Sequence, residues 1–206
     1  MSTLEIVAAL LGLVSVWLNT RENVWGWPVG AVMVALYIVV FARVQLYADA
    51  GLQAVFFVLQ FYGWYEWLHG GRARTRLLVT RTPPQLLLAL LATGAAGTLL
   101  LGTLLGRHTD QALPFWDSGI AAFSLVAQWM MARKLLESWT LWFAIDVVAV
   151  GVYWSKALHP TAALYAVFLA LCVVGWRDWS RSMRVHGAPD AMGEHVAPVD
   201  AGSTAS

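Results

Sequence analysis

Two tryptophans and an aspartate, Trp139, Trp142 and Asp146, follow one another at offsets of three and four residues. These offsets place three side chains on one stripe of a helix. At a rise of about 1.5 Å per residue, Asp146 lies roughly 13 Å into a helix that starts near Glu137. If that helix spans a bilayer, the carboxylate is close to the midplane, where an unpaired charge costs several kcal/mol and by default marks a functional site.

The chemistry of this stripe favours a flat, cationic heteroaromatic ligand. The faces of two indoles attract cations, and the carboxylate supplies a countercharge. The alternative is a buried carboxylate paired with another helix, but no Lys, Arg or His lies at comparable depth in any expected span. Tryptophan is also enriched at membrane interfaces. For Trp139, near the helix end, both interpretations stay open, whereas Trp142 lies one turn deeper and favours a ligand.

A second candidate set lies on one face of the expected helix 47–68 and comprises Gln53, Phe57 and Gln60. Amides buried in a membrane need hydrogen-bond partners, and sugar hydroxyls are suitable ones. Hydrogen bonding between helices is an equally good explanation. The sequence therefore predicts a substrate site built from Trp139, Trp142, Asp146, Gln53, Gln60 and Phe57.

Other functional classes are disfavoured by what the sequence lacks. It contains no phosphate-binding P-loop, and neither an HExxH nor a GxSxG motif, which argues against an ATP motor and against an enzyme. The five histidines fall at the ends of apolar segments or outside them, so we expect no metal site and no cofactor. The net charge of +1 gives no indication of a nucleic-acid partner.

The composition indicates a membrane protein. The chain is 59% hydrophobic and 12% charged, with a mean hydropathy of +0.63. A soluble domain of 206 residues cannot hide that much apolar surface. We expect an all-α protein with seven transmembrane helices, each of roughly 17–25 residues. The expected spans are residues 4–20, 25–43, 47–68, 85–106, 116–133, 138–155 and 161–179.

An internal duplication organises these spans. Residues 4–67 align without a gap over residues 116–179, with 17 identities in 64 pairs. Two three-helix units in tandem would insert with opposite orientations, and one extra crossing restores the same orientation to both. The sequence therefore predicts a 3+1+3 arrangement of parallel repeats, as in SWEET-type sugar transporters. The expected parts are a first repeat (1–69), a basic cytoplasmic linker (70–84), a connecting helix (85–107), a second repeat (108–181) and a disordered tail (182–206).

The distribution of basic residues predicts the orientation. With the N-terminus outside, ten Lys and Arg residues fall on the inner side and three on the outer side. This is a clear positive-inside bias. We expect an N-terminus outside, a cytoplasmic C-terminus and multiple passes through the bilayer.

Several motifs resemble those of the PnuC family of bacterial vitamin transporters. They are Val44-Gln45-Leu46-Tyr47-Ala48, Tyr62-Gly63-Trp64-Tyr65-x-Trp67, Pro114-Phe115-Trp116-Asp117-Ser118 and the stripe from Trp139 to Trp142. The resemblance covers nearly everything up to residue 180. It implies uptake of nicotinamide riboside across the bacterial cytoplasmic (inner) membrane by facilitated diffusion, with trapping by a separate kinase. It also implies a homo-oligomer, expected to be a trimer.

One position departs from the family pattern and keeps alternatives open. The nicotinamide riboside members resemble WxxWxxxN or WxxWxxxQ, whereas this chain has Asp146 at the last position. Related branches carry thiamine or riboflavin, and a carboxylate beside two indoles suits the cations nicotinamide riboside and thiamine better than neutral riboflavin. Proton-coupled transport, with Asp146 carrying the proton, is a second alternative. A non-transporting membrane subunit or vitamin sensor is a third.

Overall fold

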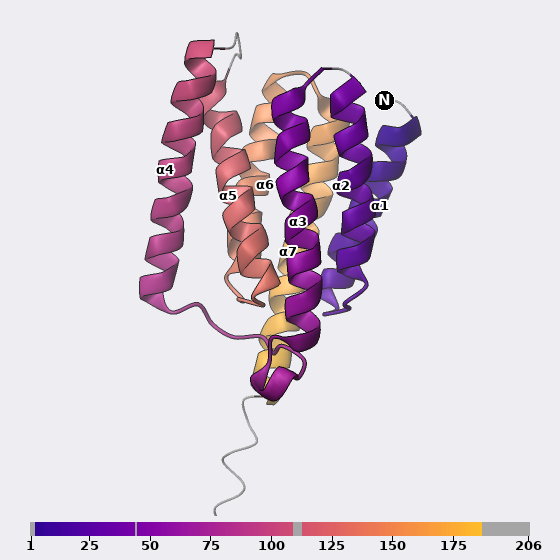
Figure 1. The fold of residues 1–206 in the computed structure, drawn as a ribbon, viewed down its shortest axis with the longest axis vertical. Coiled ribbons are helices and arrows are strands. Elements are labelled where there is room, and N and C mark those ends of the chain that lie inside the picture. Colours follow the sequence, from indigo (N-terminus) through magenta and orange to yellow (C-terminus); the bar gives the residue numbers. More distant parts are fainter. Residues whose placement is uncertain (1–2, 44, 109–112, 187–206) are drawn as a thin grey trace, which may run out of the picture.

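Seven α-helices make up most of the described chain (Figure 1). The computed structural model describes residues 3–43, 45–108 and 113–186. The helices are α1 (Thr3–Thr20), α2 (Gly26–Arg43), α3 (Tyr47–His69), α4 (Pro84–His108), α5 (Pro114–Ala132), α6 (Ser138–Ser155) and α7 (His159–His186). A short 3₁₀ helix, η1 (Arg72–Arg74), lies between α3 and α4. The prediction of an all-helical protein is therefore confirmed for these residues.

The helix ends agree with the apolar segments read from the sequence. α4 begins at Pro84 and α5 at Pro114, where the missing N–H of proline costs the helix no hydrogen bond. α7 differs, because it continues to His186. Residues 182–186, which the sequence analysis assigned to the tail, are therefore helical, and the rest of the predicted tail lies outside the described residues.

Four of the helices combine the length and the hydropathy of a membrane span, over Thr3–Thr20, Gly26–Arg43, Pro84–Arg107 and His159–Val185. The other three, α3, α5 and α6, are at least 18 residues long but do not meet both criteria. They carry Gln60, Gln128 and Asp146, which are all buried. These three helices thus carry polar side chains that face the interior of the protein.

Six helices pack as a closed ring in the order α1, α7, α6, α5, α3 and α2. α4 lies outside this ring against α5, at the left of Figure 1. Two glycines of α4 permit the close approach, because a Cβ at Gly94 would lie 2.6 Å from the ring of Phe123 and one at Gly102 would lie 2.4 Å from Phe115. The ring thus joins α1–α3 to α5–α7 through two seams, α1 against α7 and α3 against α5.

The backbone repeats at positions that the sequence alignment of the two repeats makes equivalent. Glu22 and its equivalent Lys134 both adopt positive φ, at 52° and 50°. Gln45 and its equivalent Ala157 do the same, at 60° and 58°. Such angles are uncommon for residues other than glycine. Their recurrence shows that the α1–α2 and α2–α3 connections have the same local backbone geometry as the α5–α6 and α6–α7 connections.

The two seams are closed by equivalent hydrogen bonds. The indole of Trp67 on α3 donates to the carbonyl of Met131 on α5 at 3.1 Å. The indole of Trp179 on α7 donates to the carbonyl of Asn19 on α1 at 3.0 Å. The two donors occupy equivalent positions of the aligned repeats, and so do the two acceptors. Each three-helix unit therefore contributes one buried indole to the other.

The linker of residues 70–83 crosses the end of the molecule at which α3 ends and α4 begins (Figure 1). The backbone of Thr80 exchanges two hydrogen bonds with the α5–α6 loop, donating to Lys134 at 3.1 Å and accepting from Leu136 at 2.9 Å. Thr82 donates its backbone and hydroxyl hydrogens to Glu137, both at 2.7 Å. We call this end, with the linker and the α1–α2 and α5–α6 loops, the linker end.

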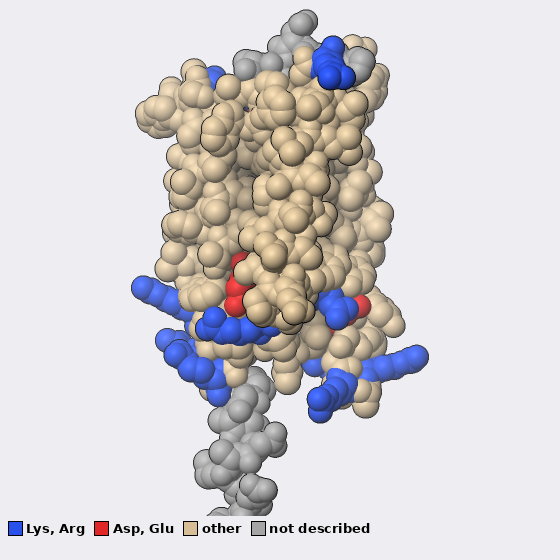
Figure 2. All heavy atoms as spheres, turned by 90° about the vertical axis from the view of Figure 1, so that its left-hand side faces the viewer, with Lys and Arg blue, Asp and Glu red and all other residues tan. Residues whose placement is uncertain are grey.

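Basic side chains gather at the linker end. Figure 2 shows most of the Lys and Arg there, below a broad band of uncharged surface. Exposed apolar side chains such as Leu88, Leu99 and Leu100 lie on α4, where each is more than 60% exposed. An uncharged band with basic residues at one end is the distribution expected of a protein embedded in a bilayer.

Candidate functional site

The stripe on α6 faces the inside of the protein. Asp146 is 3% exposed and Trp139 is 1% exposed, while Trp142 is half-buried. The structure thus agrees with the helical spacing, which placed the three side chains on one face. A carboxylate on this face is withdrawn from both water and lipid, and it needs a partner from the protein or from a ligand.

The partner of Asp146 is a thiol. Cys172 of α7 donates a hydrogen bond from Sγ to Oδ2 of Asp146 at 3.5 Å. Within the described residues, no Lys, Arg or His forms an ion pair with this carboxylate. A thiol is a weak donor and a carboxylate has about four acceptor positions. Asp146 therefore keeps most of its capacity to bind a donor or a cation.

Two tyrosines lie on the same pair of helices as this carboxylate and its thiol partner, and the sequence analysis did not identify them. They are Tyr153 of α6 and Tyr165 of α7. The two rings are stacked, with centroids 5.2 Å apart and an interplanar angle of 26°. The sequence carried a signal, because Tyr153 follows Asp146 by seven residues and so continues the same stripe. Two turns beyond Asp146 the stripe thus reaches a stacked pair of tyrosines.

The candidate residues on α3 lie in the first unit, against α2. Gln60 is 6% exposed, and its Oε1 has no hydrogen-bond partner. Its amide rests on Gly30, where a Cβ would lie 2.8 Å from both Nε2 and Oε1. Phe57 is half-buried and packs edge-on against Phe61 at 5.0 Å, and Gln53 is half-buried.

A cavity of about 340 Å³ lies beside these residues, between α2 and α3. Its lining is almost entirely apolar and aromatic, and it includes Phe57, Gln60 and Trp27. The Nε1 of Trp27, like the Oε1 of Gln60, is buried without a hydrogen-bond partner. An apolar pocket with a few convergent polar groups is the usual form of a small-molecule site.

The two candidate sets occupy equivalent helix pairs of the two units. No hydrogen bond between the described residues joins Asp146 to Gln60. In sequence terms, Gly30 corresponds to Trp142 and Gln60 to Cys172. The first unit therefore combines a small residue on α2 with a large one on α3, and the second unit reverses the sizes. This exchange leaves space for an indole beside Asp146 in the second unit only.

Trp139 belongs to a packed cluster of four tryptophans. Trp27 and Trp67 meet edge to face with centroids 5.3 Å apart, and Trp139 and Trp179 do so at 5.4 Å. Trp67 and Trp179 join the two pairs at 5.7 Å. In this conformation the ring of Trp139 offers almost no surface to a ligand. Its predicted role in stacking on a substrate stays a prediction.

Two glycines allow the outer members of this cluster, Trp27 and Trp139, to pack closely against the neighbouring helices. A Cβ at Gly63 would lie 2.2 Å from the ring of Trp27, and one at Gly175 would lie 2.4 Å from the ring of Trp139. These contacts explain why Gly63 and Gly175 recur in the duplication.

For metals, the described residues contain no group of three or more His, Cys, Asp or Glu side chains able to hold an ion.

Comparison with known proteins places these features in a family. The sequence model described as nicotinamide mononucleotide transporter matches residues 2–181. The chain is 27% identical to the nicotinamide riboside transporter PnuC of Escherichia coli (strain K12), over 91% of this chain and 89% of that protein. It is 29% identical to the riboflavin/roseoflavin transporter RibM of Streptomyces davaonensis, over 90% of this chain and 91% of that protein. A crystal structure of the vitamin B3 transporter PnuC superimposes with a TM-score of 0.71 and 25% identity, covering 89% of this chain and 83% of that one.

Proposed function

From the premise that the chain belongs to the nicotinamide mononucleotide transporter family, we propose that it takes up nicotinamide riboside across the bacterial cytoplasmic membrane. Family membership makes it a multi-pass membrane transporter and not an enzyme. The observation that carries the choice of substrate is Asp146, buried on α6 with a thiol as its hydrogen-bonding partner. A pyridinium ring would supply the missing positive charge.

We propose that all seven helices span the membrane as 3+1+3, with the two units in parallel around an axis along the membrane normal, as in SWEET-type transporters. The positive φ angles and indole hydrogen bonds that recur at equivalent positions of the two repeats support this arrangement. The basic residues at the linker end would make that end cytoplasmic, leaving the N-terminus outside. Assembly into a homo-oligomer, expected to be a trimer, rests on the family resemblance alone.

The buried residues favour the riboside over the mononucleotide. Among the described residues, Lys134 is the one buried basic side chain, and it is paired with Glu22 at the linker end. A phosphate would therefore meet the carboxylate of Asp146 without a cation to balance it. Repulsion between two anions in a medium of low dielectric constant disfavours such a ligand.

In the proposed site, the half-buried indole of Trp142 stacks on the pyridinium ring and Asp146 neutralises it. Gln53, Gln60 and Phe57 would reach the ribose from α3 once the two units close around the substrate. Trp139 would stack as well only if its ring left the tryptophan cluster. Transport would then proceed by rocking of one unit against the other, as facilitated diffusion, with a separate kinase trapping the product.

Thiamine is the second candidate substrate, because it also carries a cationic aromatic ring that suits Asp146. Riboflavin is neutral and gains less from a carboxylate, although RibM, a relative of similar identity, transports it. Proton coupling through Asp146 is the alternative mechanism. A subunit or sensor without transport activity is the remaining alternative.

Calorimetric titration of the purified protein with nicotinamide riboside, nicotinamide mononucleotide, thiamine and riboflavin tests the substrate. We expect the tightest binding for nicotinamide riboside, and tighter binding of riboflavin than of either cation would contradict the proposal. Uptake into liposomes tests the mechanism. Equilibration without a pH gradient supports facilitated diffusion, accumulation only with a gradient supports proton coupling, and no uptake of any vitamin supports the sensor.

A further inference from the structure

Three ion pairs join the two units at the linker end. In one of them the basic side chain is buried, whereas in the other two it is exposed. Arg21 pairs with Asp178 at 3.8 Å, and Arg133 pairs with Glu66 at 3.4 Å. These two pairs are equivalent in the alignment of the two repeats, and both arginines are largely exposed. The third pair joins Lys134 to Glu22 at 2.7 Å, with the Lys134 side chain fully buried.

The partners of this third pair occupy equivalent positions. Glu22 and Lys134 correspond to each other in the aligned repeats, and both lie in the loop after the first helix of their unit. Equivalent residues can touch each other only where the two units meet at their symmetry axis, as in an isologous interface. We call this contact the axial pair. It lies where the two units meet most directly at this end.

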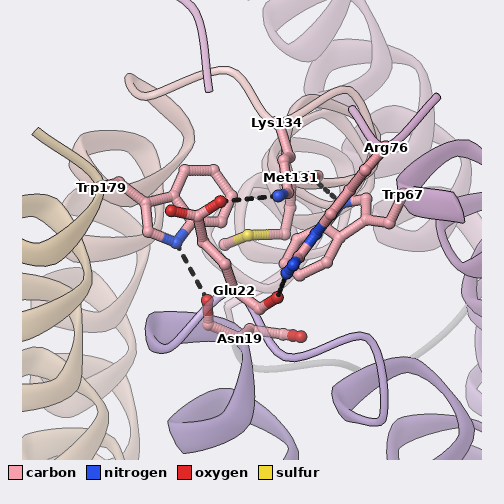
Figure 3. A network of polar contacts seen from close by, with 7 residues as sticks. All are labelled: Asn19, Glu22, Trp67, Arg76, Met131, Lys134 and Trp179. Atoms are coloured by element: carbon pink, nitrogen blue, oxygen red, sulfur yellow. Dashed lines mark hydrogen bonds and ion pairs between the residues drawn. The ribbon is translucent and has the colours of Figure 1, made fainter. Parts of the chain in front are cut away.

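Aromatic and polar contacts surround the axial pair (Figure 3). The ammonium of Lys134 lies 4.6 Å from the centroid of the Trp67 ring. Behind the pair, the indoles of Trp67 and Trp179 are hydrogen-bonded across the two seams. From the linker, the guanidinium of Arg76 donates to the backbone carbonyl of Glu22. The axial pair and the tryptophan cluster thus close the middle of the linker end. We call the two together the plug.

This plug lies between the linker end and Asp146. α6 starts at Ser138, next to the tryptophan cluster, and Asp146 follows eight residues later. Eight residues of helix correspond to about 12 Å. A substrate that moves from Asp146 along α6 to the linker end therefore meets the tryptophan cluster and the axial pair.

The two sides of the plug are not alike. On the side of α3 and α5, the linker covers the pair through Arg76 and Thr80. On the side of α1 and α7, an open depression of about 340 Å³ in the surface reaches Glu22, with Asp178 and Arg181 in its wall. The duplicated architecture is therefore covered on one side and open on the other.

We propose that the Glu22–Lys134 axial pair is the latch of a gate at the linker end, and that the gate opens along the α1–α7 side. A charged latch suits a gate because each partner is hydrated once the pair separates, which limits the free-energy cost of the open state. The passage of substrate through this gate rests on the proposed function. The latch itself can be tested without any substrate.

The single cysteine of the chain provides the probe. Cys172 is buried beside Asp146, beyond the plug as seen from the linker end. A membrane-impermeant maleimide added from the side of the linker end should alkylate it slowly in the native protein. Glu22→Gln removes the charge of the latch, and we expect alkylation about tenfold faster, as a minor open state of about 1% becomes about 10% populated. Cys172→Ala controls for labelling elsewhere.

Two further variants make the test specific. Arg133→Gln removes an exposed ion pair across the α3–α5 seam, away from the side on which the gate opens, and should leave the rate of alkylation unchanged. The double exchange Glu22→Lys with Lys134→Glu restores opposite charges and should return the rate toward that of the native protein. Unchanged alkylation in a monodisperse Glu22→Gln protein would overturn the latch. Faster alkylation in a protein that transports no vitamin would retain the latch and reject the proposed function.

Discussion

The carboxylate of Asp146 has a thiol as its hydrogen-bonding partner and a half-buried indole one turn away, so its replacement should change which substrates bind. Asp146→Asn keeps the shape and removes the charge. We expect affinity for nicotinamide riboside to fall about tenfold or more, as loss of a charge-assisted interaction of about 1.5–3 kcal/mol implies. Affinity for neutral riboflavin should stay the same or rise. Calorimetry on the two proteins measures both values.

Asp178→Asn is the matched control for this change. It removes an acid from α7, but from a pair with the largely exposed Arg21 at the linker end. Exposed pairs of this kind contribute at most about 1 kcal/mol, and this one is remote from the proposed ligand. An equal loss of riboside affinity in both variants would mean that the charge acts through the fold and not through contact with the substrate.

The carboxylate of Glu22 leads to a second prediction for a single residue, namely that the stability of the folded protein depends on pH. Burial opposes ionisation of its carboxyl, but hydrogen bonds from Lys134 and Ser182 and the charges of Lys134 and Arg76 outweigh burial and lower its pKa. A lowered pKa stabilises the fold above the ordinary value of 4.5, and this stabilisation is lost as the pH falls through the folded value. We expect the melting temperature in detergent to fall at acid pH.

Glu22→Gln should make this acid dependence shallower than in the native protein. Glu66→Gln is the control, because Glu66 pairs with a guanidinium that is largely exposed and more easily hydrated. Melting curves followed by tryptophan fluorescence between neutral and acid pH measure the difference. The same slope in the native protein and in Glu22→Gln would show that the axial pair does not contribute to stability.

At the scale of helices, the close contacts between glycines and indoles set how α2 meets α3 and how α6 meets α7. Gly63→Ala would place a Cβ 2.2 Å from Trp27, and Gly175→Ala would place one 2.4 Å from Trp139. Overpacking of this kind typically costs about 1–3 kcal/mol. We expect each variant to lower the melting temperature and to do so to a similar degree, because the two contacts are equivalent.

Gly51 supplies the control within the same helix as Gly63. A Cβ at Gly51 meets nothing within 4 Å. Since alanine favours a helix over glycine by about 1 kcal/mol, Gly51→Ala should leave the melting temperature unchanged or raise it. Destabilisation by Gly51→Ala as great as by Gly63→Ala would show that helix propensity, and not the indole contact, governs these positions.

The helices themselves were largely predictable, and their mutual contacts were not. Apolar runs located each helix start to within two residues, because this signal is local in the sequence. Nothing local could show that the indoles of Trp67 and Trp179 would cross to the opposite unit, since their acceptors lie 64 and 160 residues away.

The candidate site stays a prediction, and local signals limit it in the same way. Helical spacing placed Trp139, Trp142 and Asp146 on one stripe, but it could not distinguish a ligand-facing indole from one packed on another helix. Trp139 and Trp142 share one stripe, yet Gly175 lets the first pack tightly against α7, while the second is only half-buried. That difference depends on the size of a residue on another helix. Periodicity along α6 contains no such information.

For the whole molecule, the accumulation of basic residues at the linker end predicts the orientation in the membrane (Figure 2). Thr75 in the linker and Ser155 at the end of α6 are both exposed and lie at opposite ends of the molecule. In a Cys172→Ala background, Thr75→Cys should react with a membrane-impermeant maleimide only after cells are permeabilised. Ser155→Cys should react in intact cells. The opposite pattern would place the linker end outside, and the proposed gate would then control entry of the substrate and not its release.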